Sequence, residues 1–480
     1  MQGKFKIKKN NIKISKASSD GEAGENVSIA RKTFGDGIRI SIITSNMVDT
    51  SHSSRVLSPI EAQRRKKSFV PNDTKPKKRH AVRNLTLKSA PPIPTAPKDP
   101  IVQKKKWVIS QVKSLLSEID IFFALSVLFL AVFGIAAVNS AAHTLGGSRF
   151  LIIQSFGVIL GVFIAVLLSV IDYRSLASKY RYIIGINIAL LLITFIFGSS
   201  VTDATNANWI DLGFIKIQPS EFAKLLFIFS FAVHLGQVRD KMHKFSTVFS
   251  LAVHAGLIFG LVLLQKDLGS LTIFLVIFIS MCFAAGISMW YYIAGASFIL
   301  CASPFLWARL SQYQKDRIML CFDESIDPLG TGIRYQQLRS QTAIGNGGFF
   351  GKGYMQGTVT QGISGHLPAK HTDMIFSTIC EEFGFIGSVL ILGITCFMIY
   401  RIIRIAMKCG NTTGSYICVG VASMFMIQVI ENVGMCLGIM PVIGITYPFL
   451  SYGGSSVLSC FIAAGMVLSV CTHSEKTFFS

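Results

Sequence analysis

The sequence predicts an all-α, polytopic membrane protein with about ten transmembrane helices, one large extracytoplasmic loop and a disordered basic N-terminal arm. Hydrophobic residues make up 51% of the chain, and the mean hydropathy is +0.53, which is unusual for a soluble protein. Apolar runs of about 18–25 residues alternate with short polar breaks from Ile119 to Val470, as in multi-pass helical proteins. The positive charge is concentrated before the first of these runs.

The first 118 residues hold 25 Lys and Arg against 9 Asp and Glu, and they carry +16 of the net charge of +21. We expect residues 1–100 to be a disordered cytoplasmic arm with a Pro-rich linker, since they are rich in Ser and Lys and lack a sustained apolar period. The arm either fixes membrane topology by its charge or binds anionic lipid or an acidic partner. No nucleic-acid recognition motif accompanies the charge. Residues 101–118 are amphipathic and are predicted to lie at the membrane surface.

The membrane domain is predicted to span residues 119–475. The positive-inside rule places both termini in the cytoplasm, because the basic short loops around Arg174, Arg239 and Arg401 then lie inside. One outer loop, at about 307–372, combines Gly-rich turns with aromatics and charges of both signs, and long loops of this kind are usually functional. The predicted spans are 119–138, 150–171, 181–198, 219–235, 246–264, 268–287, 289–306, 373–400, 413–437 and 443–470.

Acidic residues beside the apolar runs are the first functional signal, since carboxylates at membrane depth are costly and usually functional. The segment NWIDLGFIKIQPSEFAKL (208–225) enters the fourth span at Pro219. Glu221 and Lys224 are three residues apart, so they can pair on one helix face. They form either a pair lining a polar cavity or a helix cap beside a snorkelling Lys. Trp209 either lines the cavity or belongs to the interfacial belt.

The second motif is QKDLGS (265–270), which joins two spans so closely that Asp267 lies at the membrane boundary. Asp267 either caps the sixth span or belongs to a functional polar site. The third motif, RIMLCFDESIDPLGTGIRYQQLRSQTAIGNGGFFGKGYMQGT (317–358), lies in the long loop. There Asp327 is followed by turn-forming residues, so an Asp-initiated turn is the structural interpretation.

Arginines in the long loop indicate a phosphate-bearing substrate, because a guanidinium group can form two parallel hydrogen bonds to a phosphate. Arg317, Arg334 and Arg339 are expected to surround Asp327. The fourth motif, PAKHTDMIFSTICEEFGFIG (368–387), includes three acids that do not suit a lipid-facing helix: Asp373, Glu381 and Glu382.

The fifth motif is ENVGMCLGIMPVIGITYPFLSYGGSS (431–456). Gly453 and Gly454 interrupt the last span in this motif, and broken helices at membrane depth normally line a cavity.

Together the five motifs resemble the FtsW/RodA (SEDS) family of cell-wall polymerases over about residues 119–470. The combination WIDLG-x₄-QPSE-x-AK, DPLG-x-G, HTD-x-IF-x₄-EEFG-x-IG and PFLSYGGSS, in this order, is highly specific. The resemblance implies a peptidoglycan glycosyltransferase of the bacterial cytoplasmic (inner) membrane. It would join lipid II disaccharides on the outer face, release undecaprenyl pyrophosphate and work with a single-span class B penicillin-binding protein, a transpeptidase.

The resemblance also implies roles for individual residues. Asp327 corresponds to the essential Asp of the DPLG motif, and we expect it to be the base. Trp209, Glu221 and Lys224 correspond to the family's Trp and to the Glu and Lys of its QPSE motif. Arg317 and Lys352 are the expected pyrophosphate contacts. No cofactor is firmly indicated, and a divalent cation is the alternative to basic residues for stabilising the leaving phosphate. The other expected cavity-lining residues are Asp267, His371, Asp373 and Ser451.

Three departures from the family pattern bear on substrate contacts. Lys266 replaces a helix-starting Pro, Asn208 replaces the usual Arg, and Ala369 replaces a common Glu. The DPLG and KGYMQGT motifs favour the elongation-type RodA members, while TYPFLSYGGSS and the long arm also suit the division-type FtsW. We favour the elongation type.

Two rival functions are considered. A lipid II flippase would use intramembrane polar residues equally well, but it needs a path reaching both faces, whereas the informative acids cluster outward. A scaffold for a transpeptidase is the other rival, and the intact catalytic-loop motifs argue against scaffolding alone.

Overall fold

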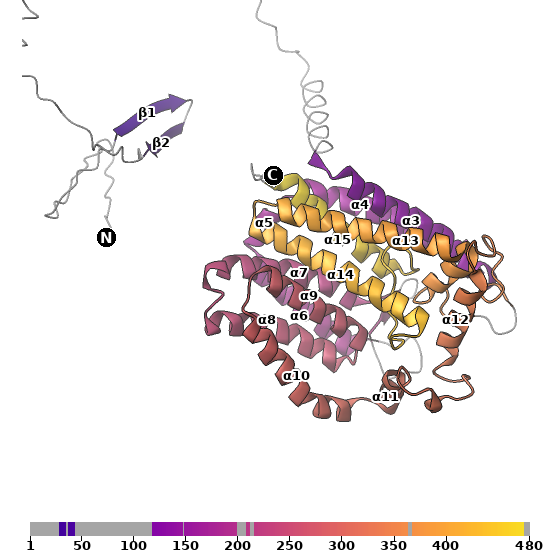
Figure 1. The fold of residues 1–480 in the computed structure, drawn as a ribbon. Coiled ribbons are helices and arrows are strands. Elements are labelled where there is room, and N and C mark those ends of the chain that lie inside the picture. Colours follow the sequence, from indigo (N-terminus) through magenta and orange to yellow (C-terminus); the bar gives the residue numbers. More distant parts are fainter. Residues whose placement is uncertain are drawn as a thin grey trace, which may run out of the picture. The chain divides into compact units, whose positions relative to one another are not determined.

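The computed structural model describes residues 28–34, 37–43, 118–146, 148–198, 208–211, 216–362 and 367–474. The predicted amphipathic segment 101–118 lies outside this part apart from Glu118, and so does most of the arm. Within the arm, β1 (Ser28–Phe34) and β2 (Gly37–Ile43) form an antiparallel hairpin (Figure 1). In β2, Ile38, Ile40 and Ile42 alternate with other residues, as suits a strand. The hairpin and the membrane domain are separate compact units.

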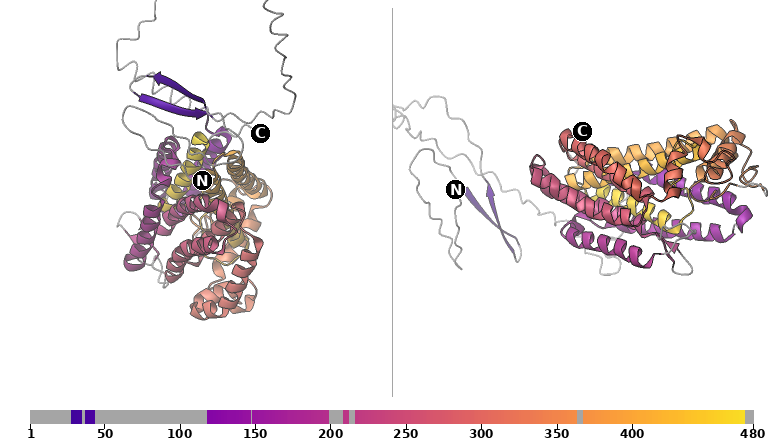
Figure 2. Two further views of the ribbon diagram at one scale, coloured as in Figure 1. Left: turned by 90° about the vertical axis from the view of Figure 1, so that its left-hand side faces the viewer. Right: turned by 90° about the horizontal axis from the view of Figure 1, so that it is seen from below.

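The membrane domain is a bundle of long helices that run side by side (Figure 1), and the left view of Figure 2 looks roughly along them. Each of the ten predicted spans contains a helix. Nine of the described helices are long and apolar enough to cross a membrane, and α9 is apolar but shorter, at 17 residues. The ten helices are α3 (Ile121–Ala142), α4 (Ser148–Val170), α6 (Tyr180–Phe197), α7 (Pro219–Val238), α8 (Phe245–Leu264), α9 (Leu268–Ala284), α10 (Met289–Arg309), α13 (Ile375–Lys408), α14 (Thr412–Leu437) and α15 (Gly454–His473).

The long loop that we predicted at the outer face contains α11, η4 and α12. The side chains of Ser340 and Gln341 on α12 donate to the carbonyl oxygens of Cys436 and Leu437 at 2.6 and 2.9 Å. These carbonyls belong to the last turn of α14, which has no intrahelical partners for them. The shorter elements are η2 (His143–Leu145), α5 (Tyr173–Ala177), β3 (Ile210–Asp211), β4 (Lys216–Ile217), η3 (Arg239–Lys241), α11 (Gln312–Met319), η4 (Glu324–Ile326) and α12 (Tyr335–Gly347).

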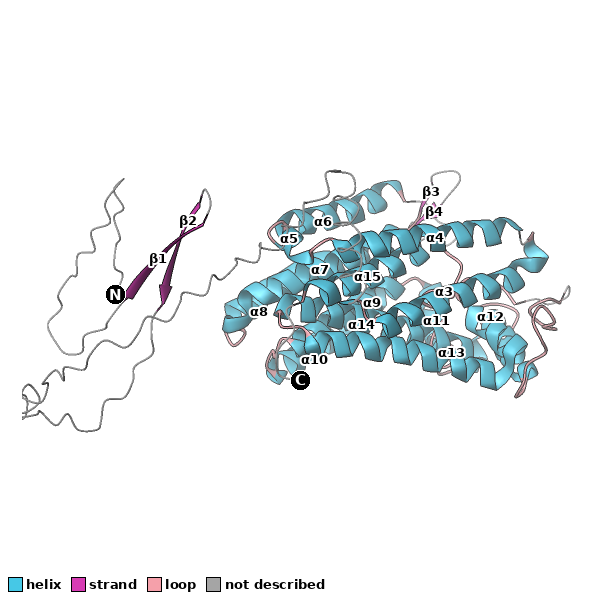
Figure 3. Cartoon of the chain, turned by 90° about the horizontal axis from the view of Figure 1, so that it is seen from above, coloured by secondary structure: helices cyan, strands magenta, loops and turns pink. Residues whose placement is uncertain are grey.

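The two ends of the described membrane domain meet at one end of the bundle, which we call the terminal end. The Cys471 thiol donates to the Glu118 carbonyl oxygen at 3.2 Å. Arg174 Nη2 donates to the His473 carbonyl oxygen at 2.6 Å, which places α5 there too. α5 and α12 lie toward opposite ends of the bundle (Figure 3), and we call the end near α12 the loop end. A chain that returns to its starting side crosses an even number of times, so α9, about 25 Å long at 1.5 Å per residue, counts as a crossing.

The last predicted span, 443–470, is wrong over its first part, because α15 begins only at Gly454. Residues 438–453 form an irregular segment that is apolar enough to resemble a helix in sequence. Gly438 ends α14 in the left-handed conformation at φ 78°, and Pro441 and Pro448 lack the N–H that a continuing helix needs. We call this stretch the 438–453 segment.

α13 is broken at Gly384, which has φ 68° and ψ −166°. The Gly-rich loop 347–353 pairs with the break. The carbonyl oxygens of Glu381 and Glu382 accept from the N–H groups of Lys352 and Gly353 at 2.9 and 3.0 Å. On the other side of the break, the N–H groups of Phe385 and Ile386 donate to the carbonyl oxygens of Gly348 and Phe349 at 2.9 and 3.2 Å. The loop thus satisfies backbone groups that lipid could not.

Candidate functional site

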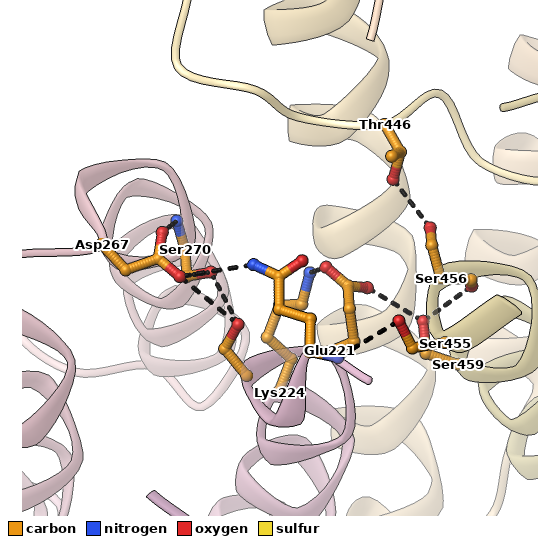
Figure 4. Close-up of polar contacts among 10 residues, drawn as sticks. Glu221, Lys224, Asp267, Ser270, Thr446, Ser455, Ser456 and Ser459 are labelled. Carbon is orange, nitrogen blue, oxygen red and sulfur yellow. Dashed lines mark hydrogen bonds and ion pairs between the residues drawn. The ribbon is translucent and has the colours of Figure 1, made fainter. Parts of the chain in front are cut away.

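A buried ion pair lies near the start of α7. Lys224 Nζ is 2.7 Å from Glu221 Oε1, and the second carboxylate oxygen accepts from the Ser459 hydroxyl of α15 at 3.0 Å (Figure 4). Lys224 is 0% exposed and Glu221 is 6% exposed. Pro219 starts α7 and turns both side chains inward on one face. The snorkelling interpretation of Lys224 is therefore wrong, because the ammonium does not reach the surface.

Asp267 lies at the start of α9, beside the same turn of α7. Its carboxylate accepts from the backbone N–H and the hydroxyl of Ser270 at 3.0 and 2.8 Å, which is the predicted cap. It also accepts from the Ser220 hydroxyl and from Gln218 Nε2, each at 3.4 Å. Figure 4 shows Asp267 and Ser270 at the start of α9 on one side of the first turn of α7, and Ser455 and Ser459 of α15 on the other. Asp267 thus serves as the cap and also joins the polar network.

The 438–453 segment connects this network to the outer loop. Thr446 Oγ1 and Ser456 Oγ are 2.7 Å apart, next to the residues that contact Glu221 (Figure 4). Gly269, two residues after Asp267, packs against the backbone of Ile443, and a Cβ there would be 3.1 Å from its carbonyl oxygen. Arg317 of α11 donates to the Val442 carbonyl oxygen at 2.7 Å. The irregular backbone therefore lies among three of the predicted motifs.

The His-Thr-Asp turn that precedes α13 is tied to the same segment. Ser451 Oγ donates to the Thr372 carbonyl oxygen at 2.6 Å, and the Tyr452 N–H donates to the His371 carbonyl oxygen at 2.8 Å. Asn432 Nδ2 donates to the Asp373 carbonyl oxygen at 2.8 Å. The predicted residues His371, Asp373 and Ser451 thus come together.

Two groups of this turn have perturbed pKa values. Burial lowers the pKa of His371 to about 4, aided by the charge of Lys370, so the imidazole is neutral at physiological pH. Its ring packs edge-on against Phe150, with centroids 5.0 Å apart. Burial raises the pKa of Asp373, whereas the Thr372 hydroxyl at 2.7 Å acts in the opposite direction. A neutral imidazole and a carboxyl that resists ionisation suit hydrogen bonding to uncharged polar groups.

Asp327 ends η4 and forms the predicted Asp-initiated turn. Its carboxylate accepts from the N–H groups of Gly332 and Arg334 at 2.9 and 3.0 Å, and from that of Thr331 at 3.3 Å. The Arg334 N–H is the main cause that lowers the pKa of Asp327 below its ordinary value. The group is therefore ionised at neutral pH, and it sits half-exposed in the outer loop.

The side chains of the three arginines near Asp327 in sequence have partners of their own. Arg334 Nη2 pairs with Glu324 Oε2 at 2.5 Å, and the Arg339 guanidinium lies 5.3 Å from the centroid of the Tyr335 ring. Arg317 stacks over Tyr313 at 4.5 Å and bonds the 438–453 segment. Each of these three side chains thus has a described partner other than Asp327, and only the Arg334 backbone N–H donates to the Asp327 carboxylate among the described contacts of the three arginines. Lys352 is exposed, and its backbone is fixed to Glu381.

The positions that depart from the family pattern have distinct geometry. Lys266 has φ 57°, which a proline could not adopt, so the turn before Asp267 has its own conformation. Its carbonyl oxygen accepts from Gln314 Nε2 of α11 at 3.4 Å. Ala369 has φ 50°. Asn208 is buried beside Trp209, which is half-buried next to β3.

Sequence reasoning missed how Glu381, Glu382 and Lys370 are used. Glu381 accepts from the N–H groups of Val359 and Thr360 at 2.8 and 2.9 Å, and Glu382 accepts from the Ser140 hydroxyl. Lys370 donates to the Thr360 carbonyl oxygen and to Thr144 Oγ1, the latter at 2.7 Å. These acids anchor the outer loop inside the bundle. Their partners lie about 20 to 240 residues away, so no local pattern signals them.

The donor set does not fit a resident metal ion. Among the described residues, no group of three or more His, Cys, Asp or Glu side chains is placed to hold one. The carboxylate of Asp327, the expected base, accepts from backbone N–H groups and has no second carboxylate among its described partners.

The fold and site define a multi-pass helical membrane protein with a buried polar network linked to a structured loop at one end. Residues 117–476 match the FtsW/RodA/SpoVE family, described as "Cell cycle protein", and the chain belongs to this family.

Three curated relatives are similar over most of their length. A probable peptidoglycan glycosyltransferase FtsW of Trichlorobacter lovleyi is 34% identical, covering 74% of this chain and 93% of the relative. Stage V sporulation protein E of Bacillus subtilis is 33% identical, covering 74% and 98%. The peptidoglycan glycosyltransferase MrdB of Escherichia coli is 33% identical, covering 65% and 83%. The identities are nearly equal across the types, so they do not bear on the predicted elongation type.

Two solved structures share the fold. One, described as "Structural coordination of polymerization and crosslinking by a peptidoglycan synthase complex", has a TM-score of 0.62 and 27% identity, covering 74% of this chain and 97% of the other. The rod shape determining protein RodA of Thermus thermophilus has a TM-score of 0.55 and 25% identity, covering 75% and 98%.

Proposed function

We propose that this protein is a peptidoglycan glycosyltransferase that polymerises lipid II at the outer face of the cytoplasmic membrane and releases undecaprenyl pyrophosphate. Relatives at 33–34% identity carry that activity in their names. The observation that carries the proposal is the 438–453 segment, which joins the Glu221 network, Asp267, the His-Thr-Asp turn and Arg317. The segment thus connects these groups to the long loop, to which Arg317 belongs.

The reaction needs a sugar hydroxyl to attack an anomeric carbon while pyrophosphate leaves. Asp327 is ionised at neutral pH, so it can accept a hydrogen bond or the proton from the attacking hydroxyl. Its three backbone donors make it a weak base in this conformation. Substrate must displace some of these N–H groups for proton abstraction, which would raise the pKa towards the working range.

Cationic side chains would stabilise the leaving pyrophosphate. Arg317 is held by Val442 and Tyr313, so its guanidinium is oriented before substrate arrives. Lys352 carries its charge on an exposed side chain whose backbone is fixed to α13. A planar guanidinium and a point charge together suit a diphosphate.

The test is polymerisation of labelled lipid II by the purified protein, with and without its cognate transpeptidase. We expect Asp327→Asn to reduce polymer formation by at least about 10²-fold, the usual range for loss of a general base. Asp323→Asn is the matched control, since Asp323 also caps a turn of the same loop, at Ser325. The control should keep activity near that of the wild type.

Full polymerisation by a folded Asp327→Asn protein would remove Asp327 from the mechanism. Absence of polymer with every protein, together with transbilayer movement of lipid II in vesicles, would favour the flippase. We include the transpeptidase because we propose a class B penicillin-binding protein as partner. One solved relative is described as a peptidoglycan synthase complex that coordinates polymerization and crosslinking, which supports such a partner. Failure of the two folded proteins to co-purify in mild detergent would count against this partnership.

A further inference from the structure

A polar cavity opens at the terminal end of the bundle, away from the candidate catalytic site. Its volume is about 290 Å³, and its lining contains two arginines but no carboxylate. Five residues from three connections line it: Arg174, Arg239, Gly410, Asn411 and Thr412.

The cavity walls are held by close packing. Arg174 Nη2 donates to the His473 carbonyl oxygen at 2.6 Å, which orients the guanidinium on α5 against the end of α15. A Cβ at Gly236, on the last turn of α7, would overlap Thr413 Oγ1, so α7 approaches the start of α14 closely just before Arg239. A Cβ at Gly414 would lie 2.7 Å from the Tyr173 hydroxyl. Both arginines are thus carried by elements packed against α14.

The chemistry of the lining selects an anion with several oxygens. Two guanidinium groups can bind phosphate with paired hydrogen bonds, and neither an acid nor a large apolar side chain competes in the lining. Asn411, which caps α14 by accepting from the Thr413 N–H at 2.9 Å, and Thr412 line the cavity, so the N-terminus of a 26-residue helix lies at its wall.

The surroundings favour a lipid over a soluble phosphate. The cavity lies where spanning helices end, which is the depth of phospholipid headgroups. Exposed apolar side chains near these ends, such as Phe245 and Met407, are 71% and 67% exposed and would contact acyl chains. Exposed Lys179, Lys241 and Lys244 add positive charge.

We propose that this cavity binds the phosphate of an anionic phospholipid of the adjacent leaflet. By the positive-inside rule this is the cytoplasmic leaflet, whose anionic lipids attract basic segments. The site is separate from the proposed catalytic chemistry and does not depend on it.

The test titrates the purified full-length protein in neutral detergent with short-chain phosphatidylglycerol and counts bound lipid by native mass spectrometry. Short-chain phosphatidylcholine and inorganic phosphate serve as competitors. We expect Arg239→Gln to weaken phosphatidylglycerol binding about tenfold, the effect of one lost charge-assisted hydrogen bond. Arg174→Gln/Arg239→Gln should weaken it further. Arg404→Gln is the control, because Arg404 contacts Tyr400 at 2.9 Å and is not part of the lining.

Arg239→Gln decides the matter even if the double variant unfolds, since Arg239 is exposed in the short helix η3 that follows α7. Equal affinities for Arg239→Gln and Arg404→Gln would overturn the proposal. Displacement of phosphatidylglycerol by an equal concentration of inorganic phosphate would overturn it as well, because the cavity would then be a soluble-phosphate site.

Discussion

At the scale of single residues, the buried Glu221–Lys224 pair shows what the sequence could and could not predict. Spacing of three residues predicted the pairing, and it occurs at 2.7 Å. The spacing could not predict whether the pair is buried or exposed. Burial depends on packing against α15, whose Ser459 lies 238 positions from Glu221. Turn chemistry did predict the local conformations at Asp267 and Asp327, since caps and Asx turns depend on neighbouring residues only.

Glu221→Ala would leave the Lys224 ammonium buried without its carboxylate. We expect the free energy of unfolding to fall by about 3–5 kcal/mol, the usual cost of breaking a buried pair. In Glu221→Ala/Lys224→Met no charge is left buried, so most of the stability should return. Thermal unfolding in detergent measures this.

Polymerase assays on the same two variants separate structure from function. If the pair contacts substrate, both variants lose activity whether or not they are stable. A stable double variant with full activity would show that the pair only holds α7.

At the scale of elements, the apolar runs and the residues that end helices predicted where most helices begin and end. They did not predict the two interruptions, the 438–453 segment and the break in α13 at Gly384. The run PVIGITYPFL is as apolar as a span, and only its two prolines signal the irregular 438–453 segment. Gly384 gave no signal at all, since glycine is tolerated inside helices that face lipid. Its role depends on the Gly-rich loop more than thirty positions earlier, which occupies the break.

Gly351→Ala tests the fit of this loop into α13. Gly351 has φ 82°, and a Cβ there would overlap the Glu382 carbonyl oxygen. We expect a loss of about 2–4 kcal/mol from overpacking and backbone strain, seen as a lower Tm. Gly345→Ala in α12 is the control, because nothing lies within 4 Å of a Cβ there. It should leave the Tm unchanged or raise it slightly. Equal Tm values for the two variants would contradict the packing described.

At the scale of the whole molecule, the sequence predicted the architecture well, because ten apolar runs leave few alternatives in a membrane. Both ends of the described domain meet through Cys471 and Glu118, which agrees with an even number of crossings. The basic loops at Arg174 and Arg401 lie at this same end, Arg401 through its ion pair with Asp120 at 2.5 Å. The sequence could not predict how the motifs pack at the loop end, because this packing depends on contacts between residues far apart in the chain.

The short helix α9 is the decisive crossing. Lys266 and Ser288 flank it and both are exposed. In a Cys321→Ser background, we expect Lys266→Cys to react with a membrane-impermeant maleimide on intact cells, and Ser288→Cys to react only after permeabilisation. Labelling of both positions from outside would mean that α9 does not cross and that the topology must be redrawn.

The pairing of loop 347–353 with the broken α13 constrains how substrate can enter. If this loop moved away from α13, four backbone groups of α13 would lose their hydrogen-bond partners in a low-dielectric medium: the carbonyls of Glu381 and Glu382 and the N–H groups of Phe385 and Ile386. The loop therefore does not open to admit substrate. Residues 322–329, with Phe322 84% and Leu329 85% exposed, have no described backbone hydrogen bond to α13 and are held by local contacts, the Asp327 turn and the Glu324–Arg334 ion pair. We infer that residues 322–329 move when a long-tailed substrate enters, while the Gly-rich loop 347–353 stays fixed against α13. Amide hydrogen exchange faster at 322–329 than at 348–353 would fit this asymmetry, and equal rates would refute it.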